Sequence, residues 1–189
     1  GLNPGDEVFV PTPYWVSYAD QIKMNEGVAV FVTATEEHHF KVTVDQLEAA
    51  RTDKTKVLLL NSPSNPTGMI YSREELEAIG NWAVEHDLLI LADDIYGRLV
   101  YNGNTFTPIS SISESIRQQT IVINGVAKAY AMTGWRIGYA VGNPEIIAAM
   151  GKIIGQTTSN LTTVAQYAAI EAFPGPHDTV EPMRQAFVV

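Results

Sequence analysis

The sequence has no cysteine, few basic residues and no long apolar run. Without cysteine the chain has no disulfide, thiolate metal ligand or thiol nucleophile, which is typical of a reducing compartment and favours a cytoplasmic location. Apolar runs such as residues 57–60 and 88–92 are far shorter than the ~20 residues that a membrane-spanning helix needs. We therefore expect no membrane span.

Charge is scarce and mostly of one sign. The chain has 12 basic and 21 acidic residues, a net charge of -9, and this argues against nucleic acid or an anionic membrane as a partner. Charged residues make up 17% of the sequence, below the usual quarter. We therefore expect part of the surface to be covered by a partner or by further sequence.

Short apolar runs alternate with helical patterns along the 189 residues, a length sufficient for one α/β domain. Most of these runs are continuously apolar, as in strands that are covered on both faces. The strands are expected at residues 8–10, 28–33, 57–61, 88–92, 120–123 and 137–141.

The clearest helix is expected over residues 73–86. Ser72 and Glu75 form the pattern of a capping box, and Leu76 and Ile79 recur on one face. Weaker helical patterns cover residues 14–25, 43–51, 144–155 and 161–173, and a further helix begins at residue 181.

The alternation predicts an α/β fold of three αβα layers, with a mostly parallel sheet between helices. Ligands bind such sheets at the carboxyl ends of the strands. Residues 173–178 are the one plausible boundary. We therefore expect a domain over residues 1–173, with residues 174–189 beginning a helix that leads to another domain.

Three polar clusters follow expected strands: "NSPSNPTG" at 61–68, "DDIY" at 93–96 and "NGVAKAYAMTGWRIGY" at 124–139. If these strands are parallel neighbours, the clusters meet at one edge of the sheet. Taken singly, the first is typical of an ordinary loop and the second of a helix cap or a Mg²⁺ pair. A lone lysine is most often solvated.

The third cluster contains two cations, Lys128 and Arg136, and no carboxylate. We expect both at the end of a buried strand, where a lysine that loses its charge becomes a nucleophile toward an aldehyde. The planar fork of an arginine suits a phosphate. Together with an acid such as Asp93 for a ring nitrogen, these groups match pyridoxal phosphate.

These motifs resemble the large domain of the fold-type I, class I aminotransferases, the aspartate aminotransferase family, and most closely its bacterial branch. The resemblance is carried by "SPSNPTG", "DDIY" and "AMTGWRIGY", and extends from "PTPYWVSY" to "TVAQYAAIEA". It implies a homodimer that binds pyridoxal 5'-phosphate and moves an amino group from an L-amino acid, most plausibly aspartate, to a 2-oxo acid.

The resemblance also implies roles for single residues. Lys128 matches the lysine that forms the Schiff base and carries protons, Asp93 matches the partner of the ring nitrogen, and Tyr96 matches a donor to the ring oxygen. No metal is implied. The implied cofactor-binding residues are Trp15, Asn65, Asp93, Tyr96, Lys128 and Arg136.

Two departures from the family pattern bear on function. Gly125 and Ala127 stand where many relatives have serines beside the lysine. In addition, no residue matches the glycine- and serine-rich phosphate loop, the tyrosine given to a neighbouring subunit or the arginine that binds the substrate α-carboxylate. We therefore expect a fragment that has little activity alone and exposes apolar surface.

Other interpretations remain open. A C-S β-lyase of the same superfamily would use the same lysine, and a non-catalytic cofactor-binding module of a transcription regulator would keep the site without turnover. No "GxGxxG" follows a strand, which argues against a nicotinamide site. His38 and His39 lack a third metal ligand at suitable spacing. Four tyrosines near the motifs are interpreted as core residues: Tyr14, Tyr18, Tyr130 and Tyr139.

Overall fold

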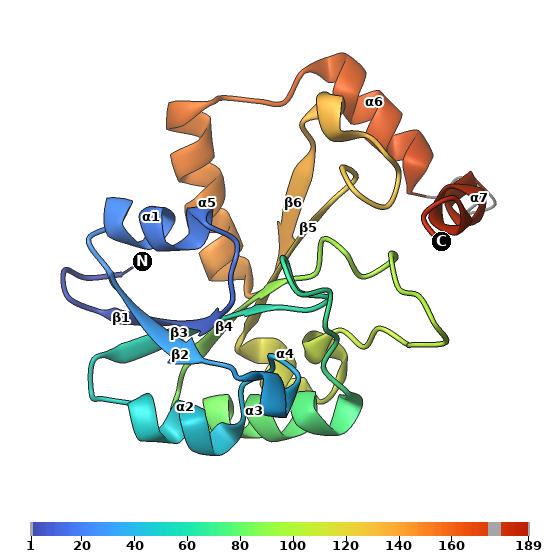
Figure 1. Cartoon of the computed structure of the whole chain (residues 1–189). Helices are drawn as coiled ribbons and strands as arrows, with labels where there is room; N and C mark the ends of the chain where they lie inside the picture. The colour runs from blue at the N-terminus through green and yellow to red at the C-terminus, as the bar shows by residue number, and fades with distance from the viewer. Residues whose placement is uncertain (1, 174–178, 189) are drawn as a thin grey trace.

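The computed structural model of the chain describes residues 2–173 and 179–188 and is built on a twisted central sheet (Figure 1). Its strand order is β2-β1-β3-β4-β5-β6; β1 to β5 run parallel and β6 is antiparallel to β5. The predicted mostly parallel sheet is confirmed. The strands are β1 (Glu7–Thr12), β2 (Val28–Thr33), β3 (Thr55–Asn61), β4 (Leu89–Asp93), β5 (Thr120–Gly125) and β6 (Gly138–Val141).

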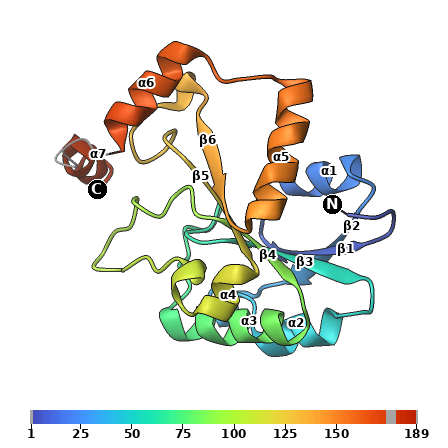
Figure 2. The same ribbon diagram turned by 180° about the vertical axis from the view of Figure 1, so that it is seen from behind.

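Helices cover the sheet on both faces, as expected for three layers. Helices α1 and α5 lie on one face, while α2, α3 and α4 lie on the other (Figures 1 and 2). The described helices are α1 (Ser17–Met24), α2 (Val44–Ala50), α3 (Arg73–Glu85), α4 (Glu114–Gln118), α5 (Pro144–Thr157), α6 (Thr163–Ala172) and α7 (Val180–Gln185). Of these, α4 was not predicted, because five residues are too few to show a helical period.

The main core fills the space between the sheet and α2, α3 and α4. Leu58 and Leu60 of β3 point into this core, whereas Leu59 between them packs under α1. All three side chains are at most 5% exposed, which explains why the strand is apolar at every position. Each fully buried leucine contributes ~1.5–3 kcal/mol to folding.

The predicted capping box fixes the start of α3. Ser72 Oγ accepts a hydrogen bond from Glu75 N, and Glu75 Oε2 accepts one from Ser72 N at 2.6 Å. These bonds satisfy backbone N–H groups that have no partner within the helix. They fix the residue at which α3 begins, and α3 packs in the main core against β3 and β4.

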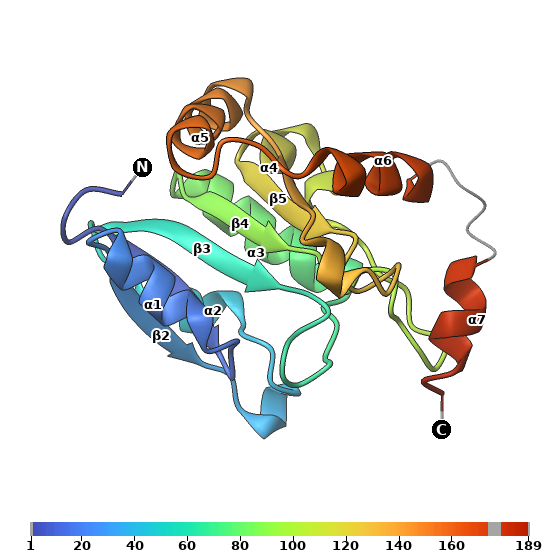
Figure 3. The ribbon, with the colours of Figure 1, turned by 90° about the horizontal axis from the view of Figure 1, so that it is seen from above.

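The helices beyond β6 leave apolar side chains in solvent. No residue of α5 is buried, and Val164, Tyr167 and Ile170 of α6 are each more than 60% exposed. Figure 3 shows α6 beyond the carboxyl ends of the strands. The expected exposed apolar surface is therefore present. No helix among the described residues is long and apolar enough to cross a membrane.

The expected domain boundary cannot be placed on this fold. Residues 174–178 lie outside the described residues, and the helix expected from residue 181 is present as α7 (Val180–Gln185). Arg184 of α7 donates a hydrogen bond to the carbonyl of Val100 at 2.6 Å, so α7 packs against the loop after β4. The division into residues 1–173 and 174–189 stays a prediction.

Candidate active site

The three polar clusters meet because β3, β4 and β5 are adjacent and parallel. Asn61 at the end of β3 is in register with Asp93 of β4, and Asp93 is in register with Ile123 of β5. The loops that follow these strands therefore leave the same edge of the sheet. The predicted convergence of the clusters is confirmed.

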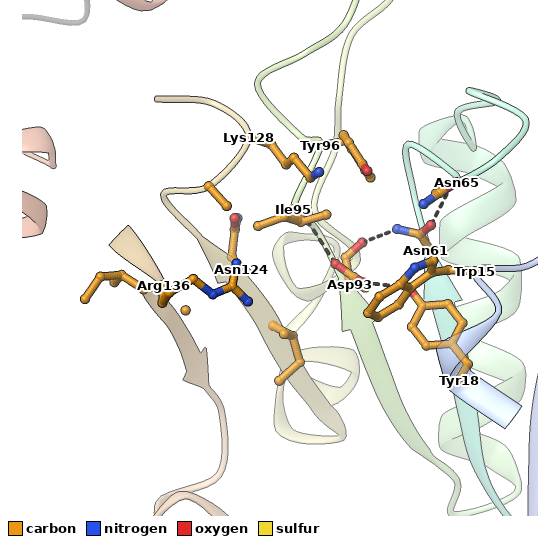
Figure 4. Close-up of a pocket in the computed structure, with 14 residues that line it drawn as sticks. Trp15, Tyr18, Asn61, Asn65, Asp93, Ile95, Tyr96, Asn124, Lys128 and Arg136 are labelled. Atoms are coloured by element: carbon orange, nitrogen blue, oxygen red, sulfur yellow. Dashed lines mark hydrogen bonds between the residues drawn. The ribbon is translucent and has the colours of Figure 1, made fainter. Parts of the chain in front are cut away.

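Between these loops lies a cavity of about 360 Å³. This volume is within the range of ~300–1,000 Å³ that is typical of small-molecule sites. Figure 4 shows the side chains of the cavity, drawn from α1 and its preceding turn, from the three loops and from β6. All six residues that the sequence singles out line it: Trp15, Asn65, Asp93, Tyr96, Lys128 and Arg136.

Asp93 stands at the centre of the cavity and is held from several directions. Its Oδ2 accepts a hydrogen bond from Tyr18 Oη at 2.5 Å, and its Oδ1 accepts one from Ile95 N at 3.2 Å. Its backbone carbonyl accepts a third, from Asn61 Nδ2 at 2.9 Å. A carboxylate has about four acceptor positions, so Asp93 can still accept hydrogen bonds from a ligand.

Asn61 connects Asp93 to the loop that carries Asn65. Besides donating to Asp93, its Oδ1 accepts a hydrogen bond from Asn65 N at 2.7 Å (Figure 4). A turn closed by Gly68 N donating to Ser64 O at 2.8 Å then folds this loop back. The backbone of Asn65 is therefore fixed relative to Asp93, while its side chain lines the cavity.

Lys128 lies at the rim of the cavity. The chain leaves β5 at Gly125 and turns, so Lys128 is exposed, and its Nζ lies 5.5 Å from the centre of the Tyr96 ring. The expectation that Lys128 and Arg136 sit in a buried strand end is wrong. The reason is that Lys128 follows the strand in a turn, and Arg136 lies in the loop before β6.

Arg136 faces the cavity from the side opposite Asn65 (Figure 4). Its backbone has φ 56, in the left-handed region, and its Nη1 donates a hydrogen bond to Thr133 O at 3.1 Å. Within residues 2–173 and 179–188, neither Arg136 nor Lys128 makes an ion pair. Both cations therefore remain available to an anionic or electrophilic ligand.

The close pairing of β5 and β6 explains one departure from the family pattern. Gly125 is in register with Gly138, and a Cβ atom on Gly125 would lie 2.7 Å from the carbonyl oxygen of Ile137. Real Cβ atoms essentially never approach backbone so closely. A serine at position 125 would therefore require β6, and with it the loop of Arg136, to move.

Two acidic groups near the cavity have raised pKa values. Burial, followed by the charge of Asp93, raises the pKa of the Tyr18 hydroxyl well above its usual value, so Tyr18 remains a donor. The same two causes raise the pKa of Asp94 to about 7. Asp94 is 6% exposed and is not among the residues that line the cavity.

Sequence reasoning missed three polar residues of the cavity: Tyr18, Asn61 and Asn124. Tyr18 was interpreted as a core residue. It is indeed buried, but its hydroxyl bonds to Asp93. Its position three residues after Trp15, within the helix expected over residues 14–25, is the available signal, since residues i and i+3 lie on the same side of a helix.

The two histidines that were set aside are exposed to solvent. His38 and His39 are exposed at the turn that follows β2, and the described residues contain no group of three or more potential ligands that could hold a metal ion. Their exposure agrees with the interpretation of a solvated loop.

Comparison with known proteins identifies the family. The profile described as aminotransferase class I and II matches residues 1–188. The chain belongs to this aminotransferase family. Among curated relatives, the asparagine–oxo-acid transaminase of Streptococcus mutans is 76% identical to this chain over 98% of its length. The aspartate aminotransferase of Bacillus sp. strain YM-2 is 58% identical, also over 98% of this chain.

Solved structures of aminotransferases share the fold. The aspartate aminotransferase of Rhizobium meliloti has a TM-score of 0.96 at 41% identity, over 99% of this chain and 47% of that one. The Thermus thermophilus aspartate aminotransferase with maleate has a TM-score of 0.90 at 42% identity, over 98% and 47%. The aminotransferase chain likewise spans 47% of the length of its Streptococcus and Bacillus relatives, about half.

Proposed function

We propose that the complete protein is a pyridoxal-phosphate-dependent aminotransferase, which moves an amino group from an L-amino acid to a 2-oxo acid. The observation that carries this proposal is the meeting of Lys128, Asp93 and Arg136 in one cavity of a chain of this family. An amine, a carboxylate and a guanidinium without an ion-pair partner form an unusual set, and each has a chemical counterpart on the cofactor.

The cavity fits the cofactor by its donor set. Trp15, a residue that is 41% exposed, offers an aromatic ring suited to stacking on the pyridine ring, and Asn65 and Tyr96 offer donors to the ring oxygen. Arg136 has four N–H groups beyond the one bonded to Thr133, enough for bidentate contact with a phosphate. When bound, the cofactor supplies an aldehyde for attachment and a ring that accepts electron density.

Asp93 and Lys128 would do the chemical work. Asp93 would hold a proton at the ring nitrogen, and its hydrogen bonds to Tyr18 and Ile95 keep the carboxylate in one orientation. The Lys128 amine would hold the cofactor through its aldehyde and, once displaced by the amine of the substrate, would be free to take a proton from the substrate Cα as a general base. Such proton transfer contributes ~10²–10⁴-fold to the rate.

Aspartate or asparagine is the proposed amino donor. The sequence analysis favours aspartate, and the Bacillus relative is an aspartate aminotransferase. The 76% identical relative is named as an asparagine transaminase, which makes asparagine the second candidate. The Thermus structure with maleate, a four-carbon dicarboxylate, supports a substrate of this length.

The proposal includes the setting in which the protein works. We infer a cytoplasmic homodimer, because the chain lacks cysteine and leaves apolar side chains of α5 and α6 in solvent. We infer that residues 1–173 form the cofactor-binding domain and that residues 174–189 lead to a second domain. The 189-residue chain alone is expected to turn over little substrate.

An assay of the protein encoded by the complete gene tests the function. Purified protein is incubated with pyridoxal phosphate, 2-oxoglutarate and either L-aspartate or L-asparagine, and the products are separated by mass spectrometry. Formation of glutamate with a 2-oxo acid from the donor supports transamination. The ratio of the two kcat/KM values identifies the donor.

A parallel incubation with a cysteine S-conjugate as substrate separates the alternatives. Release of pyruvate and ammonia from a cysteine conjugate, without glutamate formation, indicates the C-S β-lyase. Cofactor binding without turnover of any amino acid indicates the non-catalytic module. Either result contradicts the proposed transaminase.

A further inference from the structure

The Tyr18 side chain contacts both Trp15, in the wall of the cavity, and the carboxylate of Asp93. Its hydroxyl donates to Asp93 Oδ2 at 2.5 Å, and its ring meets the Trp15 ring edge to face, with centroids 5.3 Å apart. Figure 4 shows Tyr18 next to both residues, and Tyr18 is itself one of the residues that line the cavity. A tyrosine that only fills the core would not need both this hydrogen bond and this ring contact.

The surroundings of Tyr18 are rigid. It is 6% exposed and packs in a cluster with Val8, Val10, Ile22 and Leu59, which belong to β1, α1 and β3. A side chain held by three elements can fix a neighbour's position, because packed interiors tolerate little displacement. The hydrogen bond is also of the stronger, charge-assisted kind, since it ends on a carboxylate.

We propose that Tyr18 is a positioning residue, which sets the Asp93 carboxylate and the Trp15 ring relative to each other for one flat, nitrogen-containing ligand. The proposal rests on the proposed function, because that function supplies the pyridine ring. Asp93 would bind the edge of that ring and Trp15 its face, and Tyr18 contacts both. Tyr18 lines the same cavity, and its proposed role is exerted through these two residues rather than on the reacting atoms.

A tyrosine of the preceding turn provides a matched control. Tyr14 also has a stacked aromatic partner, Phe31, at 5.1 Å, but its hydroxyl makes no hydrogen bond in the described structure and it does not line the main cavity. Tyr14→Phe and Tyr18→Phe remove the same atom. Only the second substitution removes a hydrogen bond to Asp93.

The test is a double-mutant cycle in the protein encoded by the complete gene. The dissociation constant of pyridoxal phosphate is measured from the quenching of tryptophan fluorescence, in the unsubstituted protein and in an Asp93→Asn background. We expect Tyr18→Phe to weaken binding about tenfold in the first background and less than twofold in the second, because Tyr18 acts through the carboxylate. Tyr14→Phe should change binding less than twofold in both.

The outcomes separate the inference from the function on which it rests. Equal weakening by Tyr18→Phe in both backgrounds would mean a general structural role, and no weakening in either would mean no role; each result overturns the inference and leaves the proposed function standing. Failure of the unsubstituted protein to bind pyridoxal phosphate overturns both. The melting temperature of each variant is recorded, so that a loss of folding is seen directly.

Discussion

Asp94 provides a stability prediction that is independent of the cofactor. It follows β4, its amide donates to Ile123 O at 3.0 Å, and the residue is 6% exposed. Burial and the neighbouring charge of Asp93 raise the pKa of Asp94 from 3.8 to about 7. The folded protein therefore keeps this proton over a range in which the unfolded chain has lost it.

The direction and size of the effect of Asp94 on the free energy of unfolding follow from proton linkage. Between pH 3.8 and about 7 the folded state binds more protons at Asp94 than the unfolded state, so the free energy of unfolding falls as the pH rises. At 1.36 kcal/mol per pH unit, the contribution amounts to a loss of ~4 kcal/mol by pH 7. The substitution Asp94→Asn removes this titrating group. The free energy of unfolding of the variant, minus that of the parent protein, should therefore rise by ~4 kcal/mol from pH 4 to pH 8.

Urea unfolding at pH 4 and pH 8, in protein free of cofactor, measures this difference. With a slope of ~2 kcal/mol per molar urea, the variant's midpoint relative to the parent should rise by ~2 M between the two pH values. Any constant effect of burying the amide cancels in this comparison. A midpoint difference that is the same at both pH values would refute the reasoning.

Two further substitutions test the packing around the site. Tyr71→Phe should lower the free energy of unfolding, measured in urea, by ~1–3 kcal/mol, because the buried amide of Val42 loses the hydroxyl to which it donates at 2.9 Å. An unchanged urea midpoint would contradict this prediction. Gly125→Ala should cost ~1–3 kcal/mol and weaken pyridoxal phosphate binding, because its Cβ would lie 2.7 Å from Ile137 O. Gly155→Ala, in a helix with nothing within 4 Å, is the control and should be neutral or stabilising.

Much of the fold could be predicted because its signals are local. The continuous apolar runs of β3 and β4 follow from burial on both faces, and the capping box before α3 needs only Ser72 and Glu75. The meeting of the polar clusters follows from parallel strands alone. Helix α4 was missed because a five-residue helix with a single buried residue, Ile116, has no period to detect.

The details of the site depend on tertiary contacts that no local pattern carries. Tyr18 reaches Asp93, 75 residues away, only because α1 docks across β1 and β3. The exposure of Lys128 depends on where β5 ends, since the turn after Gly125 lifts the lysine from the sheet. The residue types in the sequence predict the kind of chemistry at the site. The tertiary packing determines which side-chain atoms come into contact there.

The most direct test of the central claim is the identity of the lysine that binds the cofactor. The protein encoded by the complete gene is loaded with pyridoxal phosphate, reduced with borohydride, digested and mapped by mass spectrometry. We predict that the pyridoxyl group is found on Lys128, and that Lys128→Ala remains folded and carries no label. A label on another lysine, or none on the unsubstituted protein, would contradict the account.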